Sequence, residues 1–145
     1  MSRKGTIWQS GSVAALLTVA ASFPVQAHHS AAMFDMTKRV IFHGTVEKWL
    51  WANPHAWLYL RVEKKGGVQE IWGFEAGGPN MLIRQGWNAA DIKVGEKVIV
   101  TAAPERAGKH LAQLQEVQLS DGRVLKGGGP PPDATGKAHP PQPYE

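Results

Sequence analysis

The stretch that decides the fold is residues 38–63, which read KRVIFHGTVEKWLWANPHAWLYLRVE. Up to residue 51 the side chains alternate, with one face carrying Val40, Phe42, Gly44 and Val46 and the other carrying His43, Thr45, Glu47 and Trp49. A period of two is typical of a half-buried β-strand. Asn53-Pro54 then interrupts the run, because proline lacks an amide hydrogen and keeps its predecessor out of helix. We therefore predict a second strand over 55–63, and a hairpin with Asn53-Pro54 in its turn.

The rest of the chain completes a small all-β pattern. Further strands are expected over 68–75, 97–103 and 110–119, with a short helix over 81–85 and a last short strand over 123–125. Three strands, a short helix and two more strands is the element order of an OB-fold. The sequence thus predicts an all-β fold with one short helix, an OB-fold-like five-stranded Greek-key barrel. An open β-sandwich or a split barrel is the alternative.

The chain length and composition indicate one domain with accessory segments. Its 145 residues are too few for two ordinary domains. We expect a signal peptide over 1–27, an N-terminal arm over 28–37, the barrel over 38–126 and a disordered tail over 127–145. The tail is rich in glycine and proline and cannot bury enough apolar surface to become ordered.

The first 27 residues have the three parts of a secretory signal peptide. These are the basic pair Arg3 and Lys4, the apolar run from Val13 to Phe23, and Ala27 at the cleavage position. The apolar run is shorter than the roughly 20 residues that span a bilayer. We therefore expect cleavage after Ala27, no membrane span in the mature protein, and a periplasmic or secreted location.

The charge and cysteine content restrict the class of partner. The formal net charge is +4, and it falls to +2 once the two basic residues of the signal peptide are removed. The basic clusters are no longer than the pairs Lys38-Arg39 and Lys64-Lys65, so binding to nucleic acid has little support. Because the chain has no cysteine, any metal must be bound by nitrogen and oxygen.

A set of short motifs is spread over the mature chain. They are His28-His29-Ser30, Gly44-Thr45-Val46, Trp51 to His55, Phe74-Glu75, Gly78-Pro79-Asn80, Leu82-Ile83-Arg84, Gly86-Trp87, Gly95 to Val98 and Asp121-Gly122-Arg123. Together the motifs resemble an uncharacterised family of small exported bacterial proteins, a domain of unknown function, over about residues 28 to 126. The resemblance implies an exported, single-domain β-barrel and supplies no reaction.

The histidines form the first candidate site. Removal of the signal peptide would leave His28 and His29 at a new N-terminus, whose α-amine has a pKa of about 8 and so loses its proton readily near neutral pH. The amine and the Nδ1 atom of His28 can then chelate one metal ion. Help from His29 and a third histidine would complete a nitrogen set suited to Cu(II), with His55 preferred over His43 and His110. The alternative is that the two leading histidines are only a solvated start of the chain.

The second candidate site is the polar and aromatic face of the strand after the Asn-Pro turn. It comprises Asn53, His55, Trp57, Tyr59 and Arg61, with Glu47 on the neighbouring strand. OB-folds use aromatic side chains on such faces to bind flat ligands. The alternative is structural: Trp49 or Trp57 closes the end of the barrel, and His55 only hydrogen-bonds the turn.

A third group of residues surrounds the predicted helix, and we expect it to stabilise the fold more than to form a ligand pocket. Asn80 is expected to cap the helix, Arg84 to reach back to Glu75, and Trp87 to pack beneath.

The sequence contains no nucleophile elbow, no usefully spaced pair of carboxylates and no phosphate-binding glycine loop, so we expect a binding protein and not an enzyme. The leading hypothesis is copper binding through His28, His29 and His55. The alternative is a metal-free module that binds a small molecule or a periplasmic protein through Asn53, Trp57, Tyr59 and Arg61.

Overall fold

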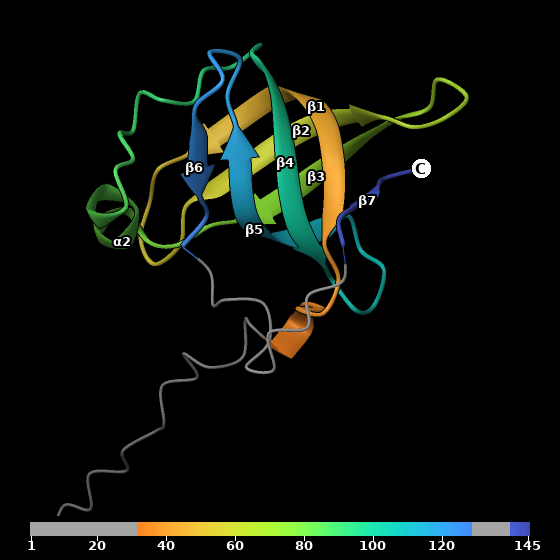
Figure 1. Cartoon of the computed structure of the whole chain (residues 1–145), viewed down its shortest axis with the longest axis horizontal. Helices are drawn as coiled ribbons and strands as arrows, with labels where there is room; N and C mark the ends of the chain where they lie inside the picture. The colour runs from red at the N-terminus through yellow and green to blue at the C-terminus, as the bar shows by residue number, and fades with distance from the viewer. Residues whose placement is uncertain (1–31, 129–139) are drawn as a thin grey trace, which may run out of the picture.

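The computed structural model describes residues 32–128 and 140–145 (Figure 1). The predicted signal peptide, His28 and His29 lie outside the described residues. The elements are β1 (Val40–Leu50), β2 (Trp57–Glu63), β3 (Gln69–Glu75), α2 (Pro79–Arg84), β4 (Lys97–Pro104), β5 (Leu111–Gln118), β6 (Val124–Lys126) and β7 (Gln142–Pro143). Within the described ranges, none of the helices has the length and apolar character needed to cross a bilayer.

Five of the strands close into a barrel. The sheet order is β2-β3-β5-β4-β1, and β1 also pairs with β2, which joins the two ends. The first part of β1 pairs with β4 and the second part with β2. All of these neighbours are antiparallel except β3 and β5, which are parallel. The prediction of an OB-like five-stranded barrel is confirmed, and the open sandwich is not what the chain forms.

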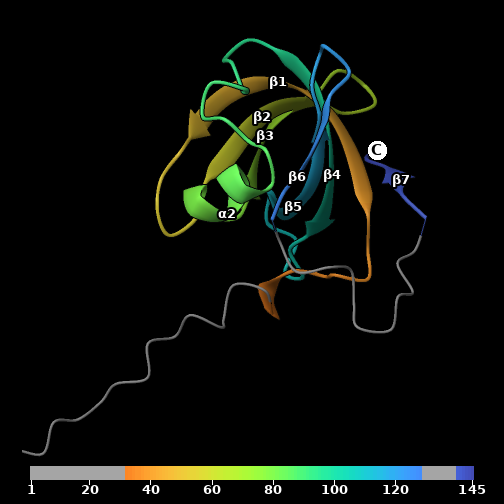
Figure 2. The same ribbon diagram turned by 60° about the vertical axis from the view of Figure 1, so that its left-hand side comes forward.

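The core lies inside this barrel because alternate residues of each strand point inward. In β2 the inward residues are Leu58, Leu60 and Val62, all buried. Phe42 of β1 packs on Phe74 of β3, with ring centroids 5.1 Å apart. The helix α2 lies outside the sheet, beyond the end of β3 (Figure 2).

The alternation of β1 changes phase at a β-bulge. The register passes from Val46 opposite Leu60 to Lys48 opposite Tyr59, so that Glu47 is the extra residue. As a result Trp49 faces Leu58, and its side chain packs against the core. The prediction that Trp49 shares the outer face with Glu47 is therefore wrong, because one inserted residue moves every later side chain to the opposite face.

The segment 140–145 is ordered against β1. Gln142 and Pro143 pair in parallel with the start of β1, and the ring of Tyr144 stacks on Phe42 at a centroid distance of 4.9 Å. The hydroxyl of Tyr144 donates a hydrogen bond of 2.6 Å to Glu70. For these six residues the prediction of a disordered tail is wrong, because an aromatic side chain and an unpaired edge of β1 give the segment something to bury and to pair with.

Candidate functional site

The turn between β1 and β2 is held against the segment that follows β3. The amide of Ala56 donates to the carbonyl of Gly77 at 3.2 Å, and the amide of Ala76 donates to the carbonyl of Ala56 at 2.9 Å. Gly78 approaches the same turn so closely that a Cβ atom there would lie 2.6 Å from the carbonyl oxygen of Pro54. The Asn53-Pro54 turn and the glycines after β3 are thus one structural unit.

Within this unit, His55 is paired with a buried acid. The Nδ1 atom of His55 lies 2.6 Å from the Oε1 atom of Glu75. The Glu75 side chain is only 7% exposed, whereas that of His55 is 39% exposed. Burial raises the pKa of Glu75, and the nearby charge of protonated His55 opposes that rise. Glu75 is the one charged residue of the described chain that is buried as a whole residue, and its partner is a histidine that reaches solvent.

This pairing determines what the imidazole can do. When Nδ1–H donates to the carboxylate of Glu75, the Nε2 atom of His55 keeps its lone pair. A carboxylate that holds a histidine in this way fixes its tautomer and ring orientation. His55 can therefore bind a metal ion or accept a proton through Nε2.

The other described histidines lie in different places. His43 is exposed on the outer face of β1. His110 stacks on Trp72 with ring centroids 5.0 Å apart, and its Nε2 atom is 3.6 Å from Glu70. Over residues 32–128 and 140–145, no three side chains of the His, Cys, Asp or Glu type are grouped so that they could hold a metal. The structure does not bring His43 or His110 to His55, and the predicted ligands His28 and His29 are outside the described part.

The aromatic face predicted on β2 is present. The rings of Trp57 and Tyr59 stack with a centroid distance of 6.2 Å and an interplanar angle of 22°, and both are half-buried. Further along, the guanidinium of Arg61 forms an ion pair with Glu47 across the bulge of β1. Asn53 is exposed in the turn. These residues form a strip of outer surface that begins beside His55.

The group around the helix differs from the prediction in two of its contacts. The N-cap of α2 is Gly78, without any side-chain hydrogen bond, and Asn80 lies inside the helix, so Asn80 is not the cap. Glu75 pairs with His55 and not with Arg84, which is exposed at the end of the helix. Arg84 points outward because it follows the buried Leu82 by two positions, which places it on the far side of the helix.

Trp87, which was predicted to pack beneath the helix, belongs to the buried core. It is buried, its ring stacks on Trp49 at 5.7 Å, and its Nε1–H donates to the carbonyl of Lys126 at 2.6 Å. The His55–Glu75 pair was missed. The sequence does carry a signal for this pair, because Glu75 is an acid within the otherwise apolar run Ile71 to Ala76. Buried acids are rare unless they are paired, so this position indicates a partner.

Comparison with known proteins identifies the chain at the level of its family. Residues 15–114 match the family described as Family of unknown function (DUF6152). The chain belongs to this family. The match confirms the resemblance to an uncharacterised domain family, and the DUF6152 match includes both the His55 turn and Glu75. No curated protein and no solved structure matches the chain.

Proposed function

We propose that this DUF6152 protein is an exported, periplasmic binding protein that binds Cu(II), with His55 as a ligand through Nε2. The observation that carries the proposal is the 2.6 Å contact between Nδ1 of His55 and the buried carboxylate of Glu75. Metal-binding histidines almost always donate their other ring N–H to a carboxylate or carbonyl. The half-exposed His55, held by the buried carboxylate of Glu75, has this arrangement.

The remaining ligands in this proposal come from the processed N-terminus. His28 would supply its α-amine and Nδ1, and His29 would assist. A set of amine and imidazole nitrogens suits Cu(II), which also has the highest affinity among the common divalent ions. The chain offers no thiolate that would favour another metal.

Copper titration of the mature protein tests the proposal. We expect His55→Ala to weaken binding strongly, and Glu75→Gln to weaken it by about 10- to 100-fold, as the loss of an outer-shell partner does. The matched control is His43→Ala, which removes an exposed imidazole from β1 and should leave the affinity unchanged. One extra residue before His28 should also weaken binding, because it removes the α-amine from the chelate.

Two results would contradict the proposal. If the extended and the correctly processed proteins bind copper equally, the N-terminal chelate is wrong. If His55→Ala lowers the free energy of unfolding but leaves copper affinity unchanged, the His55–Glu75 pair serves only to hold the turn.

A second candidate function rests on the stacked pair Trp57 and Tyr59. Their half-buried rings on the outer face of β2 offer a surface for a flat small molecule or an aromatic side chain of a partner protein. For this function Trp57→Ala should abolish ligand binding in metal-free protein, while His55→Ala should not. The opposite pattern would favour the copper site.

A further inference from the structure

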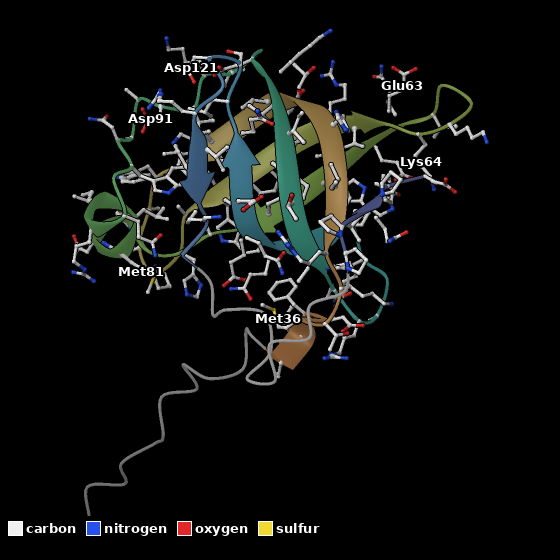
Figure 3. All side chains as sticks on the ribbon, viewed as in Figure 1. Met36, Glu63, Lys64, Met81, Asp91 and Asp121 are labelled. Atoms are coloured by element: carbon white, nitrogen blue, oxygen red, sulfur yellow. The ribbon has the colours of Figure 1, made fainter. Side chains whose placement is uncertain are left out.

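A cavity lies away from His55, toward the far end of β2. It has a volume of about 930 Å³ and extends across the outer faces of β4, β1 and β2. The hairpin that joins β2 to β3 forms one wall, and the turn between β5 and β6 forms the other. Figure 3 shows these two walls, with Glu63 and Lys64 at the hairpin and Asp121 at the opposite turn.

Basic side chains dominate the lining of the cavity. Its charged and titratable residues are Arg61, Lys64, Lys65, Lys97, His43 and Glu63. Four basic side chains therefore face a single carboxylate. Such a lining with low-dielectric walls attracts anions.

The neighbouring acids neutralise only part of this charge. Arg61 is paired with Glu47, and Lys64 lies 3.7 Å from Glu70. Over the described residues, neither Lys65 nor Lys97 takes part in an ion pair within 4.0 Å.

Two further acids near the cavity have partners other than the two lysines. Asp121, at the β5–β6 turn, pairs with Arg123. Glu96, directly before β4, accepts a hydrogen bond from the hydroxyl of Ser120 through Oε1, and its Oε2 atom has no hydrogen-bond partner among the described residues. The two lysines can therefore contact a ligand from two sides of the cavity, Lys65 from the hairpin and Lys97 from β4.

The volume of the cavity and its uncharged lining residues indicate that its ligand is a small molecule. Cavities for small ligands are typically about 300–1,000 Å³ and combine apolar walls with a few placed polar groups. Here Ile99 and Leu119 supply apolar surface, and Thr45, Gln69 and Gln118 supply hydrogen-bonding groups.

We infer that this cavity binds a small organic molecule with two or more anionic groups, with Lys65 and Lys97 as its main charged contacts. The ligand would lie across β1, with its acidic groups toward the two lysines and its carbon skeleton on Ile99. The site is separate from the proposed copper centre, which lies at the start of β2.

The test uses metal-free mature protein, since carboxylates and phosphates also bind copper. Citrate and pyrophosphate are titrated in separate experiments at constant ionic strength, and backbone amide shifts are followed by NMR. We expect saturable shifts at Thr45, Ile99 and Ser120 with at least one probe. Citrate alone would indicate a polycarboxylate ligand, and pyrophosphate alone a phosphorylated one.

The double variant Lys65→Gln/Lys97→Gln should raise the Kd of the binding probe at least tenfold. Its matched control is Lys48→Gln/Lys93→Gln, which removes the same charge from exposed lysines outside the cavity. The control should bind like the unsubstituted protein. Equal weakening in both double variants, or no saturable shift with either probe, would overturn the inference.

Discussion

Gly78→Ala is the most direct test of the unit that holds His55. A Cβ atom at Gly78 would lie 2.6 Å from the carbonyl oxygen of Pro54, a distance that requires the backbone to move. The backbone at Gly78 is extended, with φ −66° and ψ 154°, so alanine itself adopts it without strain. The substitution therefore reports only on the close approach of the two segments.

The neighbouring glycine provides the matched control. A Cβ atom at Gly77 would first meet the sulfur of Met81 at 3.0 Å, which is the flexible part of an exposed side chain. Overpacking against rigid atoms costs about 1–3 kcal/mol. Replacing glycine by alanine also restricts the unfolded chain, which stabilises by about 0.4–1 kcal/mol where no clash arises. We expect Gly78→Ala to lower the free energy of unfolding by about 1–2 kcal/mol, and Gly77→Ala to leave it nearly unchanged.

Urea unfolding at neutral pH measures both values, with tryptophan fluorescence as the signal. The ¹⁵N shifts of the His55 ring should change in Gly78→Ala and not in Gly77→Ala, because the displaced turn carries His55 away from Glu75. If the two variants are equally stable and the ¹⁵N shifts of the His55 ring are unchanged in both, the close approach of the two segments does not position the histidine.

Three other predictions concern the barrel. Phe42→Ala should lower the free energy of unfolding by about 3–5 kcal/mol in urea unfolding, because the ring is fully buried against its aromatic neighbours. The hydrogen bond from Tyr144 lowers the pKa of Glu70 below its ordinary value of 4.5. The stability that Glu70 contributes is therefore complete above pH 4.5 and is lost as the pH falls through the lowered folded-state pKa. Tyr144→Phe should make the acid-induced loss of stability less steep below pH 4.5. Trp87→Phe should cost about 1–3 kcal/mol by thermal unfolding, since it leaves the carbonyl of Lys126 without its donor; no loss would mean that water replaces the indole.

The strands could be predicted from the sequence because their signal is local. Alternation in 55–63 identifies the buried face of β2, and the Asn53-Pro54 break locates the turn. The position of Trp49 could not be predicted in the same way. Its face depends on the bulge at Glu47, which arises from the pairing of β1 with two different partner strands.

The candidate site could be predicted only in part. His55, Trp57 and Tyr59 were selected by residue type and spacing, and the structure places all three on or beside one outer strip. The partner of His55 was not found, because Glu75 lies on another strand and the contact depends on the register between β2 and β3. The same holds for Tyr144, whose partners Phe42 and Glu70 are distant in sequence.

The closure of the barrel also has a kinetic consequence. Strands far apart in the sequence must meet, since Val40 of β1 pairs with Ala102 of β4. The parallel pairing of β3 with β5 likewise cannot form until β5 has come to lie beside β3. Topologies dominated by such distant pairings fold on the order of milliseconds to seconds, more slowly than helical domains of equal size. During that interval the inward faces of β1 to β3 are exposed to water and open to association with other chains. We therefore expect refolding to depend on protein concentration, with aggregation competing with closure in concentrated solution.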